Sequence, residues 1–280
     1  MIYKKKGATG MHRIIAVNSN TYHGYSLRDA IRGTRDAGFR YIELTATKGW
    51  TEHVFPTMSF DELCKIKQEL EDYGITPFSM SGHCNLMDRG RLEDFILNIQ
   101  LAAFFECDYI ISSIGEAHLK DRAEIGDDEV AEHIKEIVPY LEKYDLVLGL
   151  ENHGKHATGK QIMEIVNLVD SPRVVINYDT ANAIYYGNVD VLEDMKACVD
   201  KIGHIHLKDK AGAHNEWNFP AIGKGTVNFS AIIDLLEKSG NDCPLSIEIE
   251  FTTDGAKDLA EVDQAVRDSY RYLKKLGLEF

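Results

Sequence analysis

Short apolar segments alternate with longer segments of helical periodicity along almost the whole chain. The apolar segments are rich in β-branched residues, and most stay apolar through the middle instead of alternating with polar residues. Parallel strands that are covered on both faces have this composition. We therefore predict eight strands, at residues 14–18, 41–44, 76–80, 109–113, 146–151, 174–179, 204–208 and 245–250.

A stretch of helical period follows each predicted strand. Ser26, Ser59 and Asp127 stand at positions suited to helix N-caps. Gly38 and Gly74 stand where helices commonly end, because glycine accepts the left-handed backbone of a helix C-terminus. The predicted helices lie at residues 26–37, 59–73, 92–106, 127–144, 159–169, 189–199, 229–239 and 256–276.

Eight consecutive strand and helix units without a linker predict an α/β fold, a closed (β/α)8 TIM barrel, in a single domain over residues 1–280. A doubly wound open sheet is the alternative, but it needs no eighth unit, and no GxGxxG follows the first strand. Residues 1–10 carry three lysines with no apolar segment after them, so we expect them to be flexible or to flank the first strand.

The charge of the chain argues against two classes of partner. Lys and Arg number 31 against 45 Asp and Glu, a formal net charge of −14, which disfavours binding to nucleic acid or to an anionic membrane surface. No apolar run is long enough to cross a membrane. The five cysteines are scattered without a CxxC pair, so we expect free thiols and a cytoplasmic protein.

Acidic and imidazole side chains stand at the ends of four consecutive predicted strands. Glu151 ends the fifth and Asp179 the sixth, and His206 and Glu248 lie near the ends of the seventh and eighth. These strand ends form the mouth of a barrel, so we expect the four side chains to converge there. Taken singly, each residue also fits a structural role such as a helix cap or an ion pair. Three carboxylates brought together repel one another, and a divalent cation is their natural counter-charge.

Three oxygen ligands and one nitrogen form a site suited to one Mn²⁺, Mg²⁺ or Co²⁺ ion, and tolerated by Zn²⁺. Two nearby residues compete for these positions because alternate residues of a strand share a face. Glu250 competes with Glu248, and His204 competes with His206. His204 lies deeper in its strand, which favours His206 as the ligand.

Four motifs carry a family resemblance: LENHG at 150–154, YDTAN at 178–182, HIHLKD at 204–209 and SIEIE at 246–250. They resemble the xylose isomerase-like barrel superfamily, with the D-tagatose 3-epimerase and L-xylulose-5-phosphate 3-epimerase groups most similar. The resemblance covers essentially the whole barrel. It implies four metal ligands, Glu151, Asp179, His206 and Glu248. It also implies Glu151 and Glu248 as the acid/base pair, and it favours Glu248 over Glu250.

Two positions depart from the pattern of that family. Asn182 stands where members often carry a histidine that bonds a substrate oxygen, and an amide can bond a hydroxyl group but cannot carry a proton at neutral pH. Lys208, Lys210 and Gly212 stand where tagatose-type epimerases carry an arginine. The substrate contacts of those enzymes therefore do not transfer unchanged.

The resemblance implies an isomerase or epimerase of a small keto sugar or sugar phosphate, which moves a proton through a metal-stabilised enediolate. Trp50 lies in a predicted mouth loop and is a candidate wall of the pocket. Gly223-Lys224-Gly225 is a weak candidate for holding a phosphate with backbone N–H groups. The predicted substrate-binding residues are Glu43, His83, Asn182, Lys208 and Trp217.

Two other classes of function remain open from the sequence. A dehydratase or a C-glycoside-cleaving lyase on the same metal barrel also begins by removing a proton beside a carbonyl group. A non-catalytic sugar-binding barrel is the third reading, and Asn182 is its only support. A homo-oligomer is expected from the resemblance alone.

Overall fold

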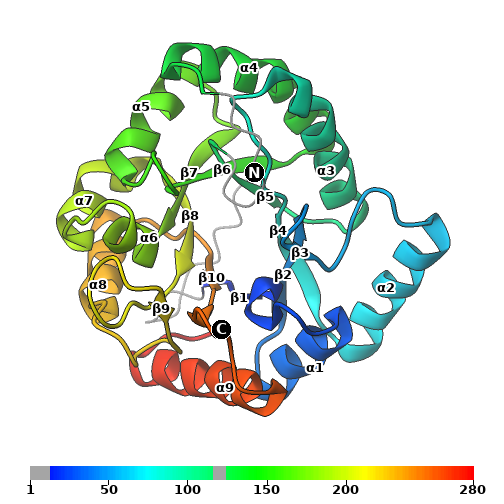
Figure 1. The fold of residues 1–280 in the computed structure, drawn as a ribbon, viewed down its shortest axis with the longest axis vertical. Helices are drawn as coiled ribbons and strands as arrows, with labels where there is room; N and C mark the ends of the chain where they lie inside the picture. Colours follow the sequence, from blue (N-terminus) through cyan, green and yellow to red (C-terminus); the bar gives the residue numbers. More distant parts are fainter. Residues whose placement is uncertain (1–12, 116–123) are drawn as a thin grey trace.

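Eight parallel strands close into a barrel in the computed structural model, which describes residues 13–115 and 124–280 (Figure 1). The barrel is closed because the first strand pairs in parallel with both the second and the last. In barrel order the strands are β1 (Ile15–Asn18), β2 (Tyr41–Thr47), β4 (Thr76–Ser81), β5 (Tyr109–Ser113), β6 (Val147–Glu151), β7 (Val174–Asp179), β8 (Ile202–Leu207) and β10 (Leu245–Ile247).

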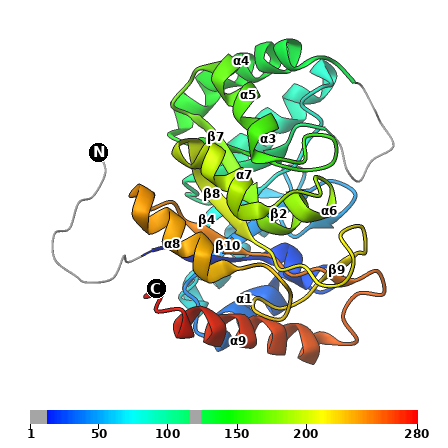
Figure 2. The ribbon, with the colours of Figure 1, turned by 90° about the vertical axis from the view of Figure 1, so that its left-hand side faces the viewer.

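Helices form a ring around this barrel, and the last of them, in red, lies beside the first, in blue (Figures 1 and 2). The α-helices of the described residues are α1 (Leu27–Ala37), α2 (Phe60–Tyr73), α3 (Leu92–Phe104), α4 (Asp127–Tyr144), α5 (Gly159–Val169), α6 (Thr180–Tyr185), α7 (Val191–Cys198), α8 (Phe229–Ser239) and α9 (Leu259–Lys275). Three 3-10 turns accompany them: η1 (Ser19–Tyr22), η2 (Arg89–Arg91) and η3 (Val199–Lys201).

Local signals in the sequence set many of the helix ends. Ser26 and Ser59 each form a capping box with the acidic residue three positions later. Gly38 and Gly74 end α1 and α2 in the left-handed conformation. The predicted cap Asp127 is wrong by one position, since Gly126 is the N-cap and Asp127 is the first helical residue, where its carboxylate contacts His156.

Short elements that the apolar pattern did not predict lie over the mouth of the barrel. β3 (Thr51–Glu52) pairs antiparallel with the end of β2. β9 (Asn218–Phe219) pairs antiparallel with β11 (Phe251–Thr252). The helix predicted at 189–199 is α7 with η3, and an additional helix, α6, starts immediately after β7. Such two-residue strands are too short to produce a periodic signal.

The described residues form a single barrel domain with one continuous hydrophobic core. Apolar side chains of the strands and of the helices belong to this core. The helices cover the outside of the barrel (Figure 1). Among the described helices none combines the length and the apolar character that crossing a membrane requires. The expectation for residues 1–10 lies outside the described residues. Because all eight strands are parallel, their C-terminal ends lie at one end of the barrel, and this end carries the candidate site.

Candidate active site and metal centre

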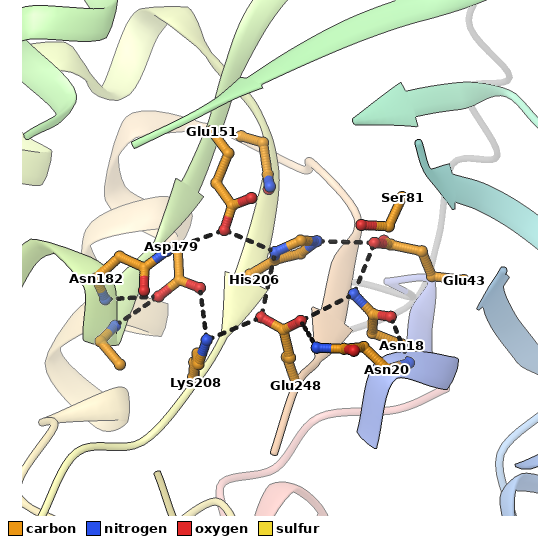
Figure 3. Close-up of polar contacts among 12 residues, drawn as sticks. Asn18, Asn20, Glu43, Ser81, Glu151, Asp179, Asn182, His206, Lys208 and Glu248 are labelled. Carbon is orange, nitrogen blue, oxygen red and sulfur yellow. Dashed lines mark hydrogen bonds and ion pairs between the residues drawn. The ribbon is translucent and has the colours of Figure 1, made fainter. Parts of the chain in front are cut away.

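Four side chains meet at the mouth of the barrel (Figure 3). Glu151 ends β6, Asp179 ends β7, His206 lies in β8, and Glu248 directly follows β10. Each offers one ligand atom, and these atoms all lie within 4.8 Å of one another. Strand register explains part of this convergence, because Asp179 stands directly opposite His206 in the pairing of β7 with β8. The structure thus brings together the four residues that the strand-end pattern singled out.

The two carboxylate oxygens of Asp179 have different surroundings. Its Oδ1 accepts hydrogen bonds from the backbone N–H groups of Ala181 and Asn182, both at 2.8 Å, and so caps α6. Its Oδ2 is buried and has no hydrogen-bond partner. The Lys208 ammonium lies 3.8 Å from it, beyond hydrogen-bond distance. A buried oxygen without a hydrogen bond, within a group of four potential ligands, is suited to bind a cation. A helix cap and a metal ligand are therefore compatible roles for this residue.

The ring of His206 is oriented by a carboxylate behind it. Nε2 lies 2.9 Å from Oε1 of Glu43, so the proton on this nitrogen is donated to Glu43. Nδ1 faces the other carboxylates, 3.4 Å from Oε1 of Glu151 and 3.8 Å from Oε2 of Glu248. Histidine ligands of metals commonly donate their second N–H to a carboxylate in this way. Nδ1 is therefore the nitrogen that can hold a cation.

Glu43 was predicted to bind substrate, but the structure places it behind His206, fully buried and outside the walls of the cavity. Asn18 Nδ2 donates to its Oε1 at 3.0 Å, and Ser79 Oγ donates to its Oε2 at 2.7 Å. Burial raises the pKa of Glu43, but His206 outweighs that effect and lowers it to about 2. β2 extends to Thr47, so Glu43 lies inside the strand and not at its end, as the predicted strand 41–44 implied.

We expect the substitution Glu43→Gln to weaken divalent-cation binding by about 10–100-fold, the usual effect of losing a partner of a histidine ligand. Glutamine keeps the shape of the side chain but lacks the charge that orients His206. Isothermal titration with Mn²⁺ measures the effect. Ser79→Ala removes only one hydrogen bond to Glu43 and is expected to have a smaller effect. An unchanged affinity in Glu43→Gln would show that Glu43 does not support the ligand.

The two histidines of β8 have different surroundings. Nδ1 of His204 contacts Oδ1 of Asn177 at 2.8 Å, inside the barrel. Burial lowers the pKa of His204 to about 4, which keeps the imidazole neutral near pH 7. His204 also groups with Glu43 and His206. Glu43 already accepts the Nε2 proton of His206. We therefore infer that Glu43 and His204 orient the ring of His206.

Glu248 and Glu250 occupy different positions, and only Glu248 belongs to the group of four. Its Oε1 accepts from Asn18 Nδ2 at 3.3 Å and from Asn20 Nδ2 at 2.9 Å. Glu250 accepts from Asn20 at 3.2 Å and forms an ion pair with Lys208. The sequence analysis missed Asn18 and Asn20, although Asn18 ends the first strand just as Glu151 and Asp179 end theirs.

Lys208 is the cation that lies among these acids. Its Nζ lies 3.2 Å from Oε2 of Glu248 and 3.8 Å from Oδ2 of Asp179, and it contacts Glu250. Burial lowers the pKa of Lys208, but the surrounding carboxylates outweigh burial and raise it well above its ordinary value. The ammonium also lies 4.6 Å from the centre of the Phe219 ring, within cation–π range.

One ammonium does not compensate all of the carboxylates. Burial raises the pKa of Asp179 well above its ordinary value in spite of Lys208, and the charges of Glu151 and Glu248 add to that rise. Burial lowers the pKa of His206, but the charges of Glu43 and Glu151 outweigh burial and raise it. The imidazole of His206 therefore holds a proton at a position where a cation can replace it. The four side chains together offer three carboxylate oxygens and one imidazole nitrogen. This set of donors fits a hard or borderline divalent ion.

A cavity lies above these ligands, and four of the five predicted substrate-binding residues line it: His83, Asn182, Lys208 and Trp217. Asn182 Nδ2 donates to Oε1 of Glu151 at 3.0 Å. Nδ1 of His83 accepts from the backbone N–H of Ser113 at 3.0 Å, which leaves the Nε2 proton for Oε2 of Glu151 at 3.2 Å. Both residues therefore orient Glu151 from the cavity side.

The Gly223-Lys224-Gly225 segment does not present free N–H groups for a phosphate. The backbone N–H groups of Gly223 and Gly225 donate to Oδ2 of Asp209, at 2.9 and 2.7 Å, and Val227 N–H donates to Oδ1 at 3.2 Å. Lys224 is exposed and lies 3.9 Å from Asp268. The turn thus binds a carboxylate of its own chain, and the sequence-based interpretation as a phosphate contact is wrong.

Comparison with known proteins places the chain among barrels of one kind. A family model described as a xylose isomerase-like TIM barrel matches residues 31–276. An uncharacterised protein of Methanocaldococcus jannaschii is 31% identical over 130 residues, which cover 44% of each chain. A 3-oxo-isoapionate decarboxylase of Pectobacterium atrosepticum is 24% identical over 181 residues, 61% of this chain and 60% of the relative. The chain thus matches less than two thirds of the length of either relative.

Solved structures share the fold at low sequence identity. A D-allulose 3-epimerase from Methylomonas sp. superposes with a TM-score of 0.73 at 15% identity, over 96% of this chain and 100% of that one. A xylose isomerase-like TIM barrel protein from Mycobacterium smegmatis, in complex with magnesium, gives a TM-score of 0.74 at 16% identity, over 96% and 99% of the two chains. An L-ribulose 3-epimerase gives 0.69 at 19% identity, over 95% and 98%.

Proposed function

The chain belongs to the xylose isomerase-like TIM barrel family, and we propose that it is a divalent-metal-dependent isomerase or epimerase of a small keto sugar. The observation that carries this proposal is the group of Glu151, Asp179, His206 and Glu248, whose ligand atoms lie within 4.8 Å of one another. The orphaned Oδ2 of Asp179 adds support. The sugar epimerases among the structural neighbours are consistent with the reaction class.

Interconversion of keto sugars requires removal of a proton from the carbon beside the carbonyl group, and the charge left behind needs stabilisation. A bound divalent cation supplies Lewis-acid stabilisation of that charge. Mn²⁺, Mg²⁺ and Co²⁺ suit the donor set, and Zn²⁺ is tolerated. We assign Glu151 and Glu248 as the acid/base pair because both are cavity walls as well as members of the ligand group.

The two oxygens of Glu151 have different surroundings, which suits a residue with two roles. Oε1 faces Nδ1 of His206 at 3.4 Å, on the ligand side. Oε2 lies 3.2 Å from Nε2 of His83, on the cavity side. One oxygen can thus hold the cation while the other accepts or returns a proton. In Glu248, Asn18 and Asn20 hold Oε1, whereas Oε2 lies near His206 and Lys208.

We favour an unphosphorylated sugar as substrate. Among the described residues that line the cavity Lys208 is the only lysine or arginine, and its ammonium already contacts three carboxylates. The turn at Gly223 to Gly225, which was the candidate phosphate contact, donates its N–H groups to Asp209. A dianionic phosphate would therefore meet more negative than positive charge at this mouth.

Removal of the metal is expected to abolish exchange of substrate protons with solvent. Protein loaded with Mn²⁺ is incubated in heavy water with D-fructose, D-tagatose and D-allulose, and deuterium beside the carbonyl is measured by NMR. We expect exchange with at least one ketose, loss of exchange after chelation, and recovery when Mn²⁺ is restored. Elemental analysis should find about one divalent ion per chain. Full exchange by a metal-free protein would overturn the metal-dependent mechanism. The absence of exchange with every ketose would overturn the proposed reaction.

A decarboxylase of a 3-oxo sugar acid is the second candidate. Loss of CO₂ from such an acid leaves an enolate, so it needs the same stabilisation of charge. The match to a 3-oxo-isoapionate decarboxylase favours it. Release of CO₂ from 3-oxo sugar acids, without exchange in simple ketoses, would support it. The same NMR spectra detect the products of a dehydratase or a C-glycoside-cleaving lyase.

A further inference from the structure

A second cavity opens directly above the candidate active site. It encloses about 570 Å³ and shares five wall residues with the inner cavity: Asn20, Trp50, Tyr186, Trp217 and Glu250. We call it the outer cavity. Its further walls come from η1, β11 and the loop after β11. Small-molecule sites commonly have volumes of roughly 300–1,000 Å³ and are lined by apolar and aromatic groups.

Aromatic rings form much of the boundary between the two cavities, and contacts with neighbours hold them in place. The indole N–H of Trp50 donates to Oδ1 of Asn20 at 2.9 Å, and the Trp50 ring stacks on His23 with 4.3 Å between centroids. Trp217 meets the ring of Phe219 edge to face at 4.9 Å. Rings that are already oriented lose little conformational entropy when a flat apolar group packs against them.

The charge of the outer cavity limits what it can hold. None of its described wall residues is a lysine or an arginine, whereas Glu250 and Asp254 are acids. Burial lowers the pKa of His23, which keeps its ring neutral. A phosphate or carboxylate would find no positive partner here. Most of the wall is carbon, and Tyr25, Ile249 and Phe251 extend the apolar surface. The walls therefore match an uncharged apolar group.

We propose that the outer cavity is a subsite for an uncharged aromatic or aliphatic substituent that the keto sugar carries, so that the substrate is a sugar conjugate. This inference rests on the proposed function, because the reacting end of the sugar must reach Glu151 and Glu248 in the inner cavity. The inner cavity has a volume of only about 30 Å³, so the rest of the sugar and its substituent lie in the outer cavity, whose 570 Å³ leaves room for both. The five shared wall residues place the two cavities side by side, so a sugar conjugate can extend from one toward the other. Burial of a phenyl-sized group on aromatic walls increases affinity through the hydrophobic effect.

The test compares sugars that differ only in the substituent. Protein loaded with Mn²⁺ is titrated calorimetrically with D-fructose, 1-O-benzyl-D-fructose, 6-O-benzyl-D-fructose and isomaltulose, which carries a glucosyl group at O6. We expect at least one benzyl derivative to bind on the order of tenfold or more tightly than D-fructose, a gain consistent with burial of one phenyl ring. Isomaltulose, with a polar substituent of larger size, is not expected to share this gain.

Two filling variants test the location. Thr253 and Ala256 line the outer cavity and not the inner one. Thr253→Trp and Ala256→Leu are expected to reduce the ratio of benzyl-fructose to fructose affinity toward one, whereas Thr253→Ser should keep it. Thr253 is exposed, so its substitution is compatible with folding.

Equal affinities for benzylated and free fructose in the native protein would overturn the subsite, as would a preference that both filling variants leave intact. A preference of equal size for isomaltulose would also overturn it, since the wall would then select size and not apolar character. Heavy-water exchange on the same samples separates the two levels of inference. If substrate protons exchange with solvent but benzylated fructose binds no more tightly than fructose, only the proposed subsite is wrong. If benzylated fructose binds more tightly but no proton of any of these sugars exchanges with solvent, the proposed reaction is wrong and the binding site remains.

Discussion

Replacement of Asp179 by asparagine is expected to abolish tight divalent-cation binding and, in the cation-free protein, to raise the melting temperature. The two effects have opposite signs because the buried carboxylate charge that attracts a cation is costly to the folded protein when no cation is bound. An asparagine here can still cap α6 through its Oδ1, which the backbone N–H groups of Ala181 and Asn182 now contact. Its Nδ2 replaces the orphaned Oδ2 and presents an N–H donor to the cation. We expect cation affinity to fall by more than about 100-fold, beyond the effect of losing an indirect partner.

The rise in stability follows from the pKa of Asp179. Burial raises that pKa above its ordinary value of 3.8, so the folded state favours the protonated carboxyl group more than the unfolded state does. The native protein therefore loses stability as the pH rises from below 3.8 through the folded-state pKa. Asparagine does not titrate, so the cation-free variant should gain most over the native protein at neutral pH and little at acid pH.

Differential scanning calorimetry with and without Mn²⁺ measures both effects of Asp179→Asn. At a cation concentration of about 1,000 Kd the native protein gains about 4 kcal/mol from binding, which for a domain of this size raises Tm by on the order of 10 °C. The variant should lose this shift. Asp209→Asn is a matched comparison, since Asp209 is also a buried acid bonded to backbone N–H groups but lies outside the ligand group. If Mn²⁺ raised the Tm of Asp179→Asn as much as it raises that of the native protein, Asp179 would not be a ligand.

Substitution of either acid/base glutamate by glutamine is expected to lower the rate of epimerisation by about 10²–10⁴-fold, the usual contribution of a positioned acid or base. The informative readout is the pattern of deuterium exchange. If Glu151 and Glu248 serve opposite faces of the sugar, each variant retains the base for one epimer. Glu151→Gln should then exchange the proton of one member of an epimeric pair, and Glu248→Gln that of the other, while neither converts one epimer into the other.

Measurements at saturating Mn²⁺ separate loss of the base from loss of a ligand. Glu250→Gln is the matched control, because Glu250 lies two residues from Glu248 and borders the same cavity but is not part of the ligand group. We expect Glu250→Gln to retain exchange with both epimers. An equal loss in all three variants would remove the distinction between Glu248 and Glu250. Loss of deuterium exchange in only one of the variants Glu151→Gln and Glu248→Gln would favour an isomerase with a single base.

Several features of the site were predictable, and the failures have physical explanations. The strand-end rule selected Glu151, Asp179, His206 and Glu248 because parallel strands bring their C-terminal ends to the same edge. The same rule, applied to the first strand, would have found Asn18. Glu43 was misplaced because the apolar pattern of β2 stops at Leu44 while the strand continues through threonines and an alanine to Thr47. Pattern and propensity locate elements better than they locate element ends.

The eight repeated units, the parallel closed barrel and the convergence of acids at one end follow from the sequence alone, because the spacing of apolar residues depends only on local backbone geometry. Tertiary structure decided which atoms face one another. It showed that Nδ1 of His206 faces Glu151 and Glu248, that Oδ2 of Asp179 has no hydrogen-bond partner, and that the turn at Gly223 holds Asp209. These pairings join residues far apart in the chain through side-chain rotamers and strand register, and packing of the whole barrel fixes both.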